Sequence, residues 1–381
     1  MFQFFARLKH HAKVLVGTQI GRLLEKRYFA GRGPAGRVIS GFSEQAKRIG
    51  VRQKLLIEPS PLNRPVLNYF LNGKTEDEYR HKLLSGEDAT IKAGIFSTQN
   101  AEITFPTGMH KIDGYILSEA ILAPYLLTNP KYYLGYQSLR FRKKRKIDEG
   151  VLLSMPFYHN YYHWLIEILP RLLLYDRCSA LQDVPIIVPK SAPNFVTESL
   201  RLSGYHAKSL YLDNGAYNFK KLHMLSRLGT MLEVSPDAIN WLNNKFEHTA
   251  PTLVTPKRVY VSRGDANIRF VSNEYQLVDV LSKFGFESLA MSGYSLPEQI
   301  KIFRDADFII GPHGAALSNL AFSKPGASVI EFFARGHFAP CFNRISTIRG
   351  LKYGFLVGEP TRFGGFAIDP ADLRAILAQA L

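Results

Sequence analysis

The chain has 381 residues, enough for two domains at roughly 100–200 residues per domain. Hydrophobic residues make up 46% and charged residues 21%, which indicates a folded globular protein and excludes a disordered or fibrous one. Lysine and arginine total 48 against 32 acidic residues, and the resulting net charge of +16 favours polyanions, anionic lipid or phosphorylated substrates without choosing among them.

The cysteine content and hydropathy predict the compartment. Cys178 and Cys341 are the only cysteines and form no C-x-x-C pattern, which argues against a disulfide framework and a thiolate zinc site. No window holds the ~18 apolar residues of a membrane span, and no signal peptide pattern precedes the first domain. A cytoplasmic protein is therefore expected.

Residues 1–40 form the first predicted segment, which is basic. Apolar residues from Phe5 to Leu23 recur at helical spacing and predict an amphipathic helix, and the glycines between Ala30 and Gly41 predict a loop or linker. Such a helix can lie on an anionic bilayer, here the inner face of the cytoplasmic membrane, or it can pack on the next domain. Gln19 and the adjacent His10 and His11 interrupt its apolar face, which slightly favours packing.

Residues 41–250 are predicted to form a first lobe that begins with a β-rich part at Ala89–Ala123. A strand at Val184–Val188 and a helix at Asn194–Ser203 follow in alternating order, which is typical of a parallel sheet covered on both faces. The basic run Arg140–Lys146 is either a solvated loop or a contact for phosphate or lipid headgroups.

The second predicted lobe, residues 251–365, alternates strands and helices in the manner of a doubly wound sheet. The expected linker before it is Trp241–Lys257, and a C-terminal helix over 366–381 is expected after it, with Asp369 as N-cap. The expected elements are strands at Val259–Ser262, Glu287–Ala290, Phe308–Ile310 and Val329–Phe333, and helices at Asn273–Phe284 and Ser295–Arg304.

A glycine turn carrying His313 follows the strand Phe308–Ile310 and leads into a helix at Ala315. The first amides of a helix have no intrahelical partner and carry partial positive charge, so this turn suits a diphosphate. Gly311 and Gly314 permit a tight turn and a close approach of the ligand. An ordinary strand-to-helix turn, with His313 bonded to a neighbouring carbonyl, remains the alternative.

Other polar groups follow the ends of neighbouring strands, where open parallel sheets bind ligands. Ser262, Arg263 and Arg269 come after one strand, and guanidinium groups can neutralise a diphosphate without a metal. The alternative is a surface ion pair with Asp265 or Glu274.

Glu331 lies within an apolar strand, where a carboxylate needs hydrogen-bond donors. A ribose diol would supply them. An internal ion pair with Arg335 or Arg344 is the alternative.

In the first lobe, a spacing of four predicts that His159, His163 and Glu167 share one helical stripe. The stripe can hold a general base. Zinc is disfavoured because no third ligand is evident, and a core helix with satisfied histidines around Trp164 is the remaining alternative.

In their order along the chain, these segments resemble glycosyltransferase family 61, which includes capsular polysaccharide and lipopolysaccharide enzymes and eukaryotic xylosyl- and N-acetylglucosaminyltransferases. The resemblance covers about residues 150–335. It rests on Asn160-Tyr161-Tyr162-His163-Trp164 with Glu167 and Pro170-Arg171, Ser262-Arg263 with Arg269 and Asn273-Glu274, Gly311-Pro312-His313-Gly314-Ala315, and Pro325-Gly326-Ala327 leading to Glu331.

The resemblance implies a GT-B α/β fold, in which two Rossmann-like lobes face a cleft, and it implies inversion at the anomeric carbon. By motif match, the second lobe holds the nucleotide sugar and the first lobe lies on the acceptor side. The donor contacts would be Ser262, Arg263, Arg269, His313, Gly314 and Ala315, with Glu331 on the ribose. The acceptor side would comprise His159, Asn160, Tyr162 and Arg171, together with His163 and Glu167 as candidates for the general base.

Two details qualify the resemblance. Ala316 stands where the family often has glycine, which narrows the ligand's approach. Asp305-Ala306-Asp307 spells the D-x-D of metal-dependent transferases but precedes the strand rather than the diphosphate turn, so Mg²⁺ or Mn²⁺ is not expected.

The expected function is that of a metal-independent inverting glycosyltransferase. It would move a hexosyl or pentosyl group from a nucleotide sugar (UDP-, CMP- or GDP-linked) to a surface glycan or glycolipid, such as a capsule or lipopolysaccharide precursor. Glu167 is preferred slightly over His163 as the base, although a carboxylate would need burial to raise its pKa. No cofactor and no nucleic acid partner are expected. The alternatives are a nucleotide-sugar epimerase on the same fold and a basic scaffold or nucleic-acid-binding protein.

Overall fold

The computed structural model describes residues 37–71, 73–86, 89–106, 108–121, 143–230, 232–249 and 251–381. The predicted N-terminal basic helix lies outside the described residues, as do residues 140–142 of the basic run. Among the described residues, the structure contains no helix with the length and hydropathy of a membrane span.

The described chain divides into two compact units. Residues 37–60 and 89–230 form the N-terminal unit, and residues 61–86 and 232–381 form the C-terminal unit. The chain therefore passes between the units more than once, and neither unit is a continuous stretch of sequence.

The N-terminal unit is built on a mixed sheet with strand order β2-β3-β9-β6-β7-β8, and β4 pairs with β3. β9, β6, β7 and β8 run parallel, whereas β2 and β3 are antiparallel to their neighbours. The strands of this sheet are β2 (Arg52–Ile57), β3 (Ala93–Phe105), β4 (Met109–Lys111), β6 (Lys144–Leu152), β7 (Ile186–Pro189), β8 (Ser209–Leu212) and β9 (Gly215–Leu225). A separate parallel pair is formed by β1 (Arg37–Ile39) and β5 (Tyr115–Leu117).

The helices of this unit are short and mostly irregular. They are α2 (Glu44–Arg48), η2 (Ser118–Ala120), the π-helix η4 (His163–Ile168), η5 (Leu169–Arg171), α5 (Leu172–Asp176), η6 (Ser179–Leu181), α6 (Asn194–Leu202) and η7 (His206–Lys208). The expected β-rich part is confirmed as β3 to β5, and the alternating strand and helix are confirmed as β7 and α6.

The C-terminal unit is a doubly wound α/β domain, as predicted. Its sheet has the order β11-β10-β12-β13-β14-β15, and all neighbours are parallel except β14 and β15. In chain order the first five strands follow the pattern 2-1-3-4-5 of doubly wound folds. The strands are β10 (Arg258–Val261), β11 (Glu287–Leu289), β12 (Phe308–Pro312), β13 (Ser328–Ala334), β14 (Lys352–Pro360) and β15 (Phe366–Ala367).

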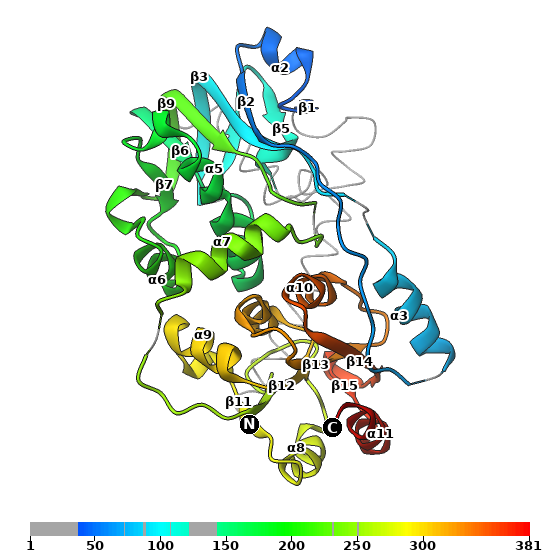
Figure 1. Ribbon diagram of the computed structural model, residues 1–381. Coiled ribbons are helices and arrows are strands. Elements are labelled where there is room, and N and C mark those ends of the chain that lie inside the picture. Colours follow the sequence, from blue (N-terminus) through cyan, green and yellow to red (C-terminus); the bar gives the residue numbers. More distant parts are fainter. Residues whose placement is uncertain are drawn as a thin grey trace. The chain divides into compact units, whose positions relative to one another are not determined.

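Helices cover both faces of this sheet. On one face, α8 and α11 pack against the sheet through a shared hydrophobic core, and α9 and α10 lie on the other face (Figure 1). The helices are α3 (Lys74–Leu84), α7 (Pro236–Phe246), α8 (Glu274–Ser282), η8 (Met291–Gly293), α9 (Leu296–Asp305), the 3₁₀ helix η9 (Ala315–Phe322), α10 (Cys341–Arg349), η10 (Arg362–Gly364) and α11 (Pro370–Ala380).

The division into units differs from the predicted boundaries at 250 and 365. Residues 61–86 join the C-terminal unit because Tyr69 pairs with Gly354 of β14 and because the Tyr79 ring packs on Phe333 and Phe355. The C-terminal helix α11, capped by Asp369 as predicted, belongs to the core of the same unit. The expected linker at Trp241 is wrong in its first half, which continues α7 to Phe246.

Candidate functional site

The C-terminal unit has a topological switch point between β10 and β12, since β11 lies on one side of β10 and β12 on the other. Ligands of open α/β sheets bind beyond the carboxyl ends of the strands at such a point. Arg263 follows β10 and His313 follows β12, so the predicted anion-binding residues of both strands do meet at this edge.

Gly314 and Arg263 are in direct contact. A Cβ placed on Gly314 would collide with the Arg263 guanidinium, so the glycine leaves the space that this side chain occupies. The backbone at Gly314 is extended (φ −177°), and positive φ is therefore not the reason for glycine here. Gly311 is close to the neighbouring strand, since its Cβ would lie 2.9 Å from Cβ of Val261. Both glycines therefore permit the close approach of other protein groups, Arg263 and Val261, where the sequence predicted the approach of a ligand.

The predicted helix after the turn is present, but it is a 3₁₀ helix that starts at Ala315. Side chains three residues apart eclipse in such a helix, and Ala315 and Ser318 are small enough to tolerate this. Its first amides are still without intrahelical partners.

The guanidinium groups of Arg263 and Arg269, at the switch point, each have more N–H donors than hydrogen bonds in this structure. Arg263 donates to the Ile268 carbonyl at 3.2 Å, and its Nε is buried without a hydrogen-bond partner. Arg269 contacts Nε2 of His337. Within the described ranges, no ion pair joins Arg263 or Arg269 to a carboxylate, which sets aside the predicted alternative of a pair with Asp265.

Burial and mutual repulsion act on these groups. Burial, followed by Arg269, lowers the pKa of Arg263 to about 10, and Asp265 opposes this shift. Burial also lowers the pKa of Arg269. Both side chains are half-buried, and Arg269 repels Arg263 more strongly than Asp265 attracts it. An anionic ligand next to both guanidinium groups would reduce this repulsion.

Ser262 and Glu274 organise the loop that carries Arg263. The Ser262 hydroxyl donates to Glu274 at 2.9 Å and accepts from the amide of Gly264 at 3.1 Å. Glu274 also accepts from the Tyr260 hydroxyl and from the backbone amide of Arg263. Ser262 was predicted as a donor contact, but its hydroxyl is engaged within the loop.

Glu331 is fully buried on β13, and its two oxygens contact Nδ1 of His313 and the hydroxyl of Tyr353. In this structure the carboxylate is internal, with His313 as its partner, whereas the predicted alternatives Arg335 and Arg344 pair with Glu359 and Glu233. The ribose contact stays a prediction. The contact with Glu331 fixes the ring of His313, whose side chain is 11% exposed, and leaves Nε2 as the nitrogen that can face a ligand.

His337 completes what we call the basic cluster: Arg263, Arg269, His313 and His337. It was missed from the sequence, although it follows β13 in the same way that Arg263 follows β10. Its ring lies edge-on to His313 with 5.2 Å between centroids.

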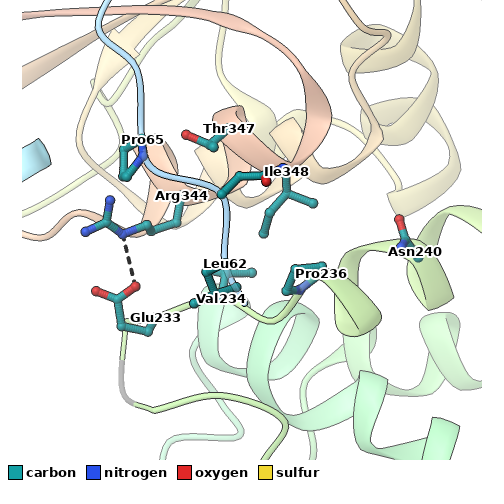
Figure 2. A pocket seen from close by; sticks show the side chains of 10 residues that line it. Leu62, Pro65, Glu233, Val234, Pro236, Asn240, Arg344, Thr347 and Ile348 are labelled. Carbon is teal, nitrogen blue, oxygen red and sulfur yellow. Dashed lines mark hydrogen bonds and ion pairs between the residues drawn. The ribbon is translucent and has the colours of Figure 1, made fainter. Parts of the chain in front are cut away.

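A separate cavity of about 140 Å³ lies in the same unit between α7, α10 and the segment around Leu62 and Pro65 (Figure 2). Its charged groups, Glu233 and Arg344, pair with each other at 3.0 Å. A cavity whose charges are already paired does not suit a diphosphate, in contrast with the basic cluster.

The D-x-D carboxylates are both engaged with lysines. Asp305 pairs with Lys301 at 2.7 Å, and Asp307 pairs with Lys324. Among the described residues, no group of three or more histidine, cysteine or acidic side chains is placed to hold a metal ion.

The N-terminal unit has its own switch point, between β6 and β9, because β7 and β8 lie on the far side of β6. The π-helix η4 follows β6 and carries His163 and Glu167, whose Nδ1 and Oε2 atoms are 2.6 Å apart. Their side chains are 17% and 10% exposed. π-helical turns are rare and frequently occur at functional sites.

Arg227 follows β9 at the same edge and was also missed from the sequence. Burial lowers its pKa, and attraction to Glu167 and Glu119 opposes that shift. Its position after a parallel strand is the signal by which it could have been found.

The predicted acceptor-side residues His159, Asn160 and Tyr162 lie at or just before the start of the helix that carries His163. The helix starts at Tyr161, so His159 precedes it and the predicted three-residue stripe is wrong for His159. Asn160 caps the helix, since its Oδ1 accepts from the amides of Tyr162 and His163 at 3.0 and 3.3 Å. Tyr162 is 6% exposed, with its ring edge-on to that of His163.

Arg171 is only 1% exposed. It donates to the carbonyls of Ser226 and Leu153 at 3.2 and 3.3 Å, and burial lowers its pKa to about 9. In this structure it binds the backbone of its own unit, and the predicted contact with an acceptor stays a prediction.

The C-terminal unit is thus an α/β domain with a cluster of arginine and histidine side chains at its topological switch point. A family model described as Glycosyltransferase 61 matches residues 161–330, so the chain carries a glycosyltransferase 61 domain there and the predicted resemblance is confirmed. The matched range contains His163, Glu167 and the whole basic cluster except His337.

A curated relative is the beta-1,2-xylosyltransferase RCN11 of Oryza sativa subsp. japonica, 25% identical over 172 residues. The match covers 42% of this chain and 32% of the relative, so the chain matches about a third of that protein's length. Both comparisons support a glycosyltransferase.

Proposed function

We propose that this protein is a metal-independent inverting glycosyltransferase that moves a hexosyl or pentosyl group from a nucleotide sugar to a surface glycan or its lipid-linked precursor. The observation that carries the proposal is the basic cluster, in which Arg263 and Arg269 lack carboxylate ion pairs among the described residues, within a family 61 domain. Guanidinium groups and helix amides stabilise a departing diphosphate without a metal.

In the proposed architecture the two units are the lobes of a GT-B enzyme, with the donor on the C-terminal unit and the acceptor on the N-terminal unit. The acceptor oxygen attacks the anomeric carbon in line, the bond from that carbon to the phosphate oxygen breaks, and the nucleoside diphosphate leaves. A base takes the proton of the acceptor hydroxyl.

His163 is the proposed base, with Glu167 as its orienting group. Glu167 meets Nδ1, so Nε2 is the nitrogen available to a substrate proton. This assignment reverses the slight preference for Glu167 that the sequence alone supports. Arg227 attracts Glu167 and helps to hold the carboxylate in place.

A thermal-shift screen of UDP-, CMP- and GDP-linked sugars in EDTA tests the proposal. One nucleotide class should raise the melting temperature of the wild type, and Arg263→Ala should abolish the shift. Arg374→Ala, at an exposed position of α11 in the same unit, is the matched control and should keep it.

Three outcomes would contradict the proposal. A shift that requires Mg²⁺ or Mn²⁺ argues against metal independence. Conversion of the nucleotide sugar to an epimer without an acceptor identifies an epimerase. Stabilisation by RNA or DNA alone, lost with added salt, identifies a nucleic-acid-binding protein.

The assignment of the base has its own test. His163→Asn and Glu167→Gln should each lower transfer by about 10²-fold to 10⁴-fold, the usual contribution of a general base, while nucleotide-sugar binding stays unchanged. His206→Asn, an exposed histidine of the same unit, is the control. Loss in Glu167→Gln alone would make Glu167 the base, and full turnover in both variants would remove both residues from the mechanism.

A further inference from the structure

The backbone of His337 is anchored by hydrogen bonds at the edge of the basic cluster. Its backbone amide donates to the Ala334 carbonyl at 2.9 Å, and its carbonyl accepts from the Tyr79 hydroxyl at 3.4 Å. The same hydroxyl accepts from the amide of Gly336 at 3.0 Å. These bonds fix the backbone from which the imidazole projects, and the ring itself is left to its side-chain contacts.

The side chain of His337 faces cations. Nε2 contacts NH1 of Arg269, which can only donate, so Nε2 is the acceptor and carries no proton in this arrangement. His313 lies against the ring from the β12 side, and Arg263 is near enough to repel a charge on it.

Among the described residues, the acidic and polar groups around His337 interact with other residues and not with its imidazole. Glu331 of β13 is engaged by His313 and Tyr353, and Asp265 opposes the repulsion on Arg263. From α10 the Cys341 thiol interacts with Arg269. From α3 the Tyr79 hydroxyl bonds backbone atoms of Ala334, Gly336 and His337. No described carboxylate is bonded to His337 itself.

We propose that His337 is a fourth phosphate-binding residue of the donor site, neutral in the empty site and protonated when the diphosphate is bound, so that donor binding takes up one proton. The inference rests on the proposed function, since it assigns the anion to the basic cluster. Protonation converts Nε2 of His337 from an acceptor to a donor, so the hydrogen bond from Arg269 NH1 to Nε2 is lost. Both side chains can then donate to the phosphate.

The electrostatics agree with the geometry. Burial, followed by repulsion from Arg269, His313 and Arg263, lowers the pKa of His337 to about 4. A bound phosphate places negative charge next to the same ring and raises that pKa. Between the pKa of the empty site and that of the bound site, affinity should rise about tenfold for each unit by which the pH falls, because one proton is taken up.

Inorganic pyrophosphate is the probe, because it carries the diphosphate without a base or sugar. Its affinity for the wild-type chain, measured by calorimetry from pH 7.5 to pH 5.5, should increase about tenfold per unit over part of this range. His337→Asn should remove that increase, and His248→Asn, an exposed histidine of the same unit, should keep it. Protonation of pyrophosphate itself is common to all three proteins and cancels in the comparison.

A measurement on the wild type alone guards against a variant that fails to fold. With ¹³C-labelled histidine, the His337 signal should titrate near pH 4 without ligand and above pH 5.5 with saturating pyrophosphate. An unchanged titration, or the same pH dependence in His337→Asn as in the wild type, would overturn the inference while leaving the proposed function intact. Absence of pyrophosphate and nucleotide-sugar binding at every pH would instead remove the anion site on which both rest.

Discussion

Gly314 shows how one absent side chain shapes the candidate donor site. The sequence indicates that a glycine here permits close approach, and the structure identifies the group that approaches as the Arg263 guanidinium. Which group fills the space could not be predicted, because Arg263 is brought there by the pairing of β10 with β12.

Gly314→Ala should therefore displace Arg263 and weaken nucleotide-sugar binding. A hydrogen bond to a charged group contributes about 1.5–3 kcal/mol, which corresponds to about tenfold to 100-fold in affinity. Gly293→Ala is a matched control, since nothing lies within 4 Å of its added Cβ. Equal affinity in both variants, measured by calorimetry, would show that Arg263 does not bind the donor.

Glu331 shows how far an apolar strand in the sequence predicts the partners of a buried carboxylate. The apolar strand predicts that the carboxylate needs donors, and it has them, but His313 and Tyr353 supply them. Tyr353 lies on β14, a strand that the sequence analysis did not pair with β13.

Replacing Tyr353 by Phe removes one donor from a fully buried carboxylate. An unsatisfied buried group costs about 1–3 kcal/mol, and more when it is charged, so the melting temperature should fall by several degrees. Thermal denaturation by circular dichroism measures this, with Tyr275→Phe, at an exposed position, as the control. An unchanged melting temperature would mean that the hydroxyl contributes nothing.

At the scale of the element, the helix that carries His163 is the feature that sequence periodicity predicts only in part. The spacing of four correctly predicts that His163 and Glu167 touch. It does not reveal the π-helical turn, because an α-helix and a π-helix present similar neighbours over so short a stretch. The left-handed conformation of Phe157 (φ 70°) just before it is likewise a product of the packed structure.

The start of this helix gives a test of Asn160. Asn160→Ala should lower stability by about 1 kcal/mol through loss of the cap, and transfer should fall because the backbone under His163 loosens. Asn160→Ser restores a capping oxygen and should rescue both. Loss of transfer in the serine variant at full stability would instead show that Asn160 binds the acceptor directly, as the sequence resemblance implies.

At the scale of the whole molecule, a buried histidine in the N-terminal unit makes stability depend on pH. His110 is fully buried, accepts from the Leu117 amide at 2.9 Å, and has its pKa lowered to about 3 by burial, followed by Arg171. Its usual pKa is about 6.5, so the unfolded chain binds the extra proton between these values. Its contribution to stability is complete above pH 6.5 and is lost as the pH falls toward 3.

Melting temperatures at pH 7 and pH 5 measure this effect. Over the interval below pH 6.5 the loss amounts to about 1.4 kcal/mol per pH unit, which is about 2 kcal/mol at pH 5. His110→Gln keeps an acceptor for Leu117 and should melt with a smaller difference between the two pH values, whereas His206→Gln should behave as the wild type. The same difference in all three would rule out His110 as the source.

The order of strands and helices in the C-terminal unit could be predicted because each element has a local pattern. The membership of residues 61–86 could not, since their pairing with β14 joins residues as distant as Tyr69 and Gly354. Periodicity and turn signals act over a few residues, so they say nothing about which distant segments share a core.

That pairing also has a consequence for how the protein is made. During translation, the segment around Tyr69 is synthesised long before its pairing partner Gly354. Residues 89–230 of the N-terminal unit are synthesised between the two. Tyr79 likewise is synthesised long before Gly336 and His337, whose backbone its hydroxyl bonds in the folded protein. The nascent chain therefore exposes apolar surface until synthesis is nearly complete, and its yield in the cell should depend on chaperones that shield this segment.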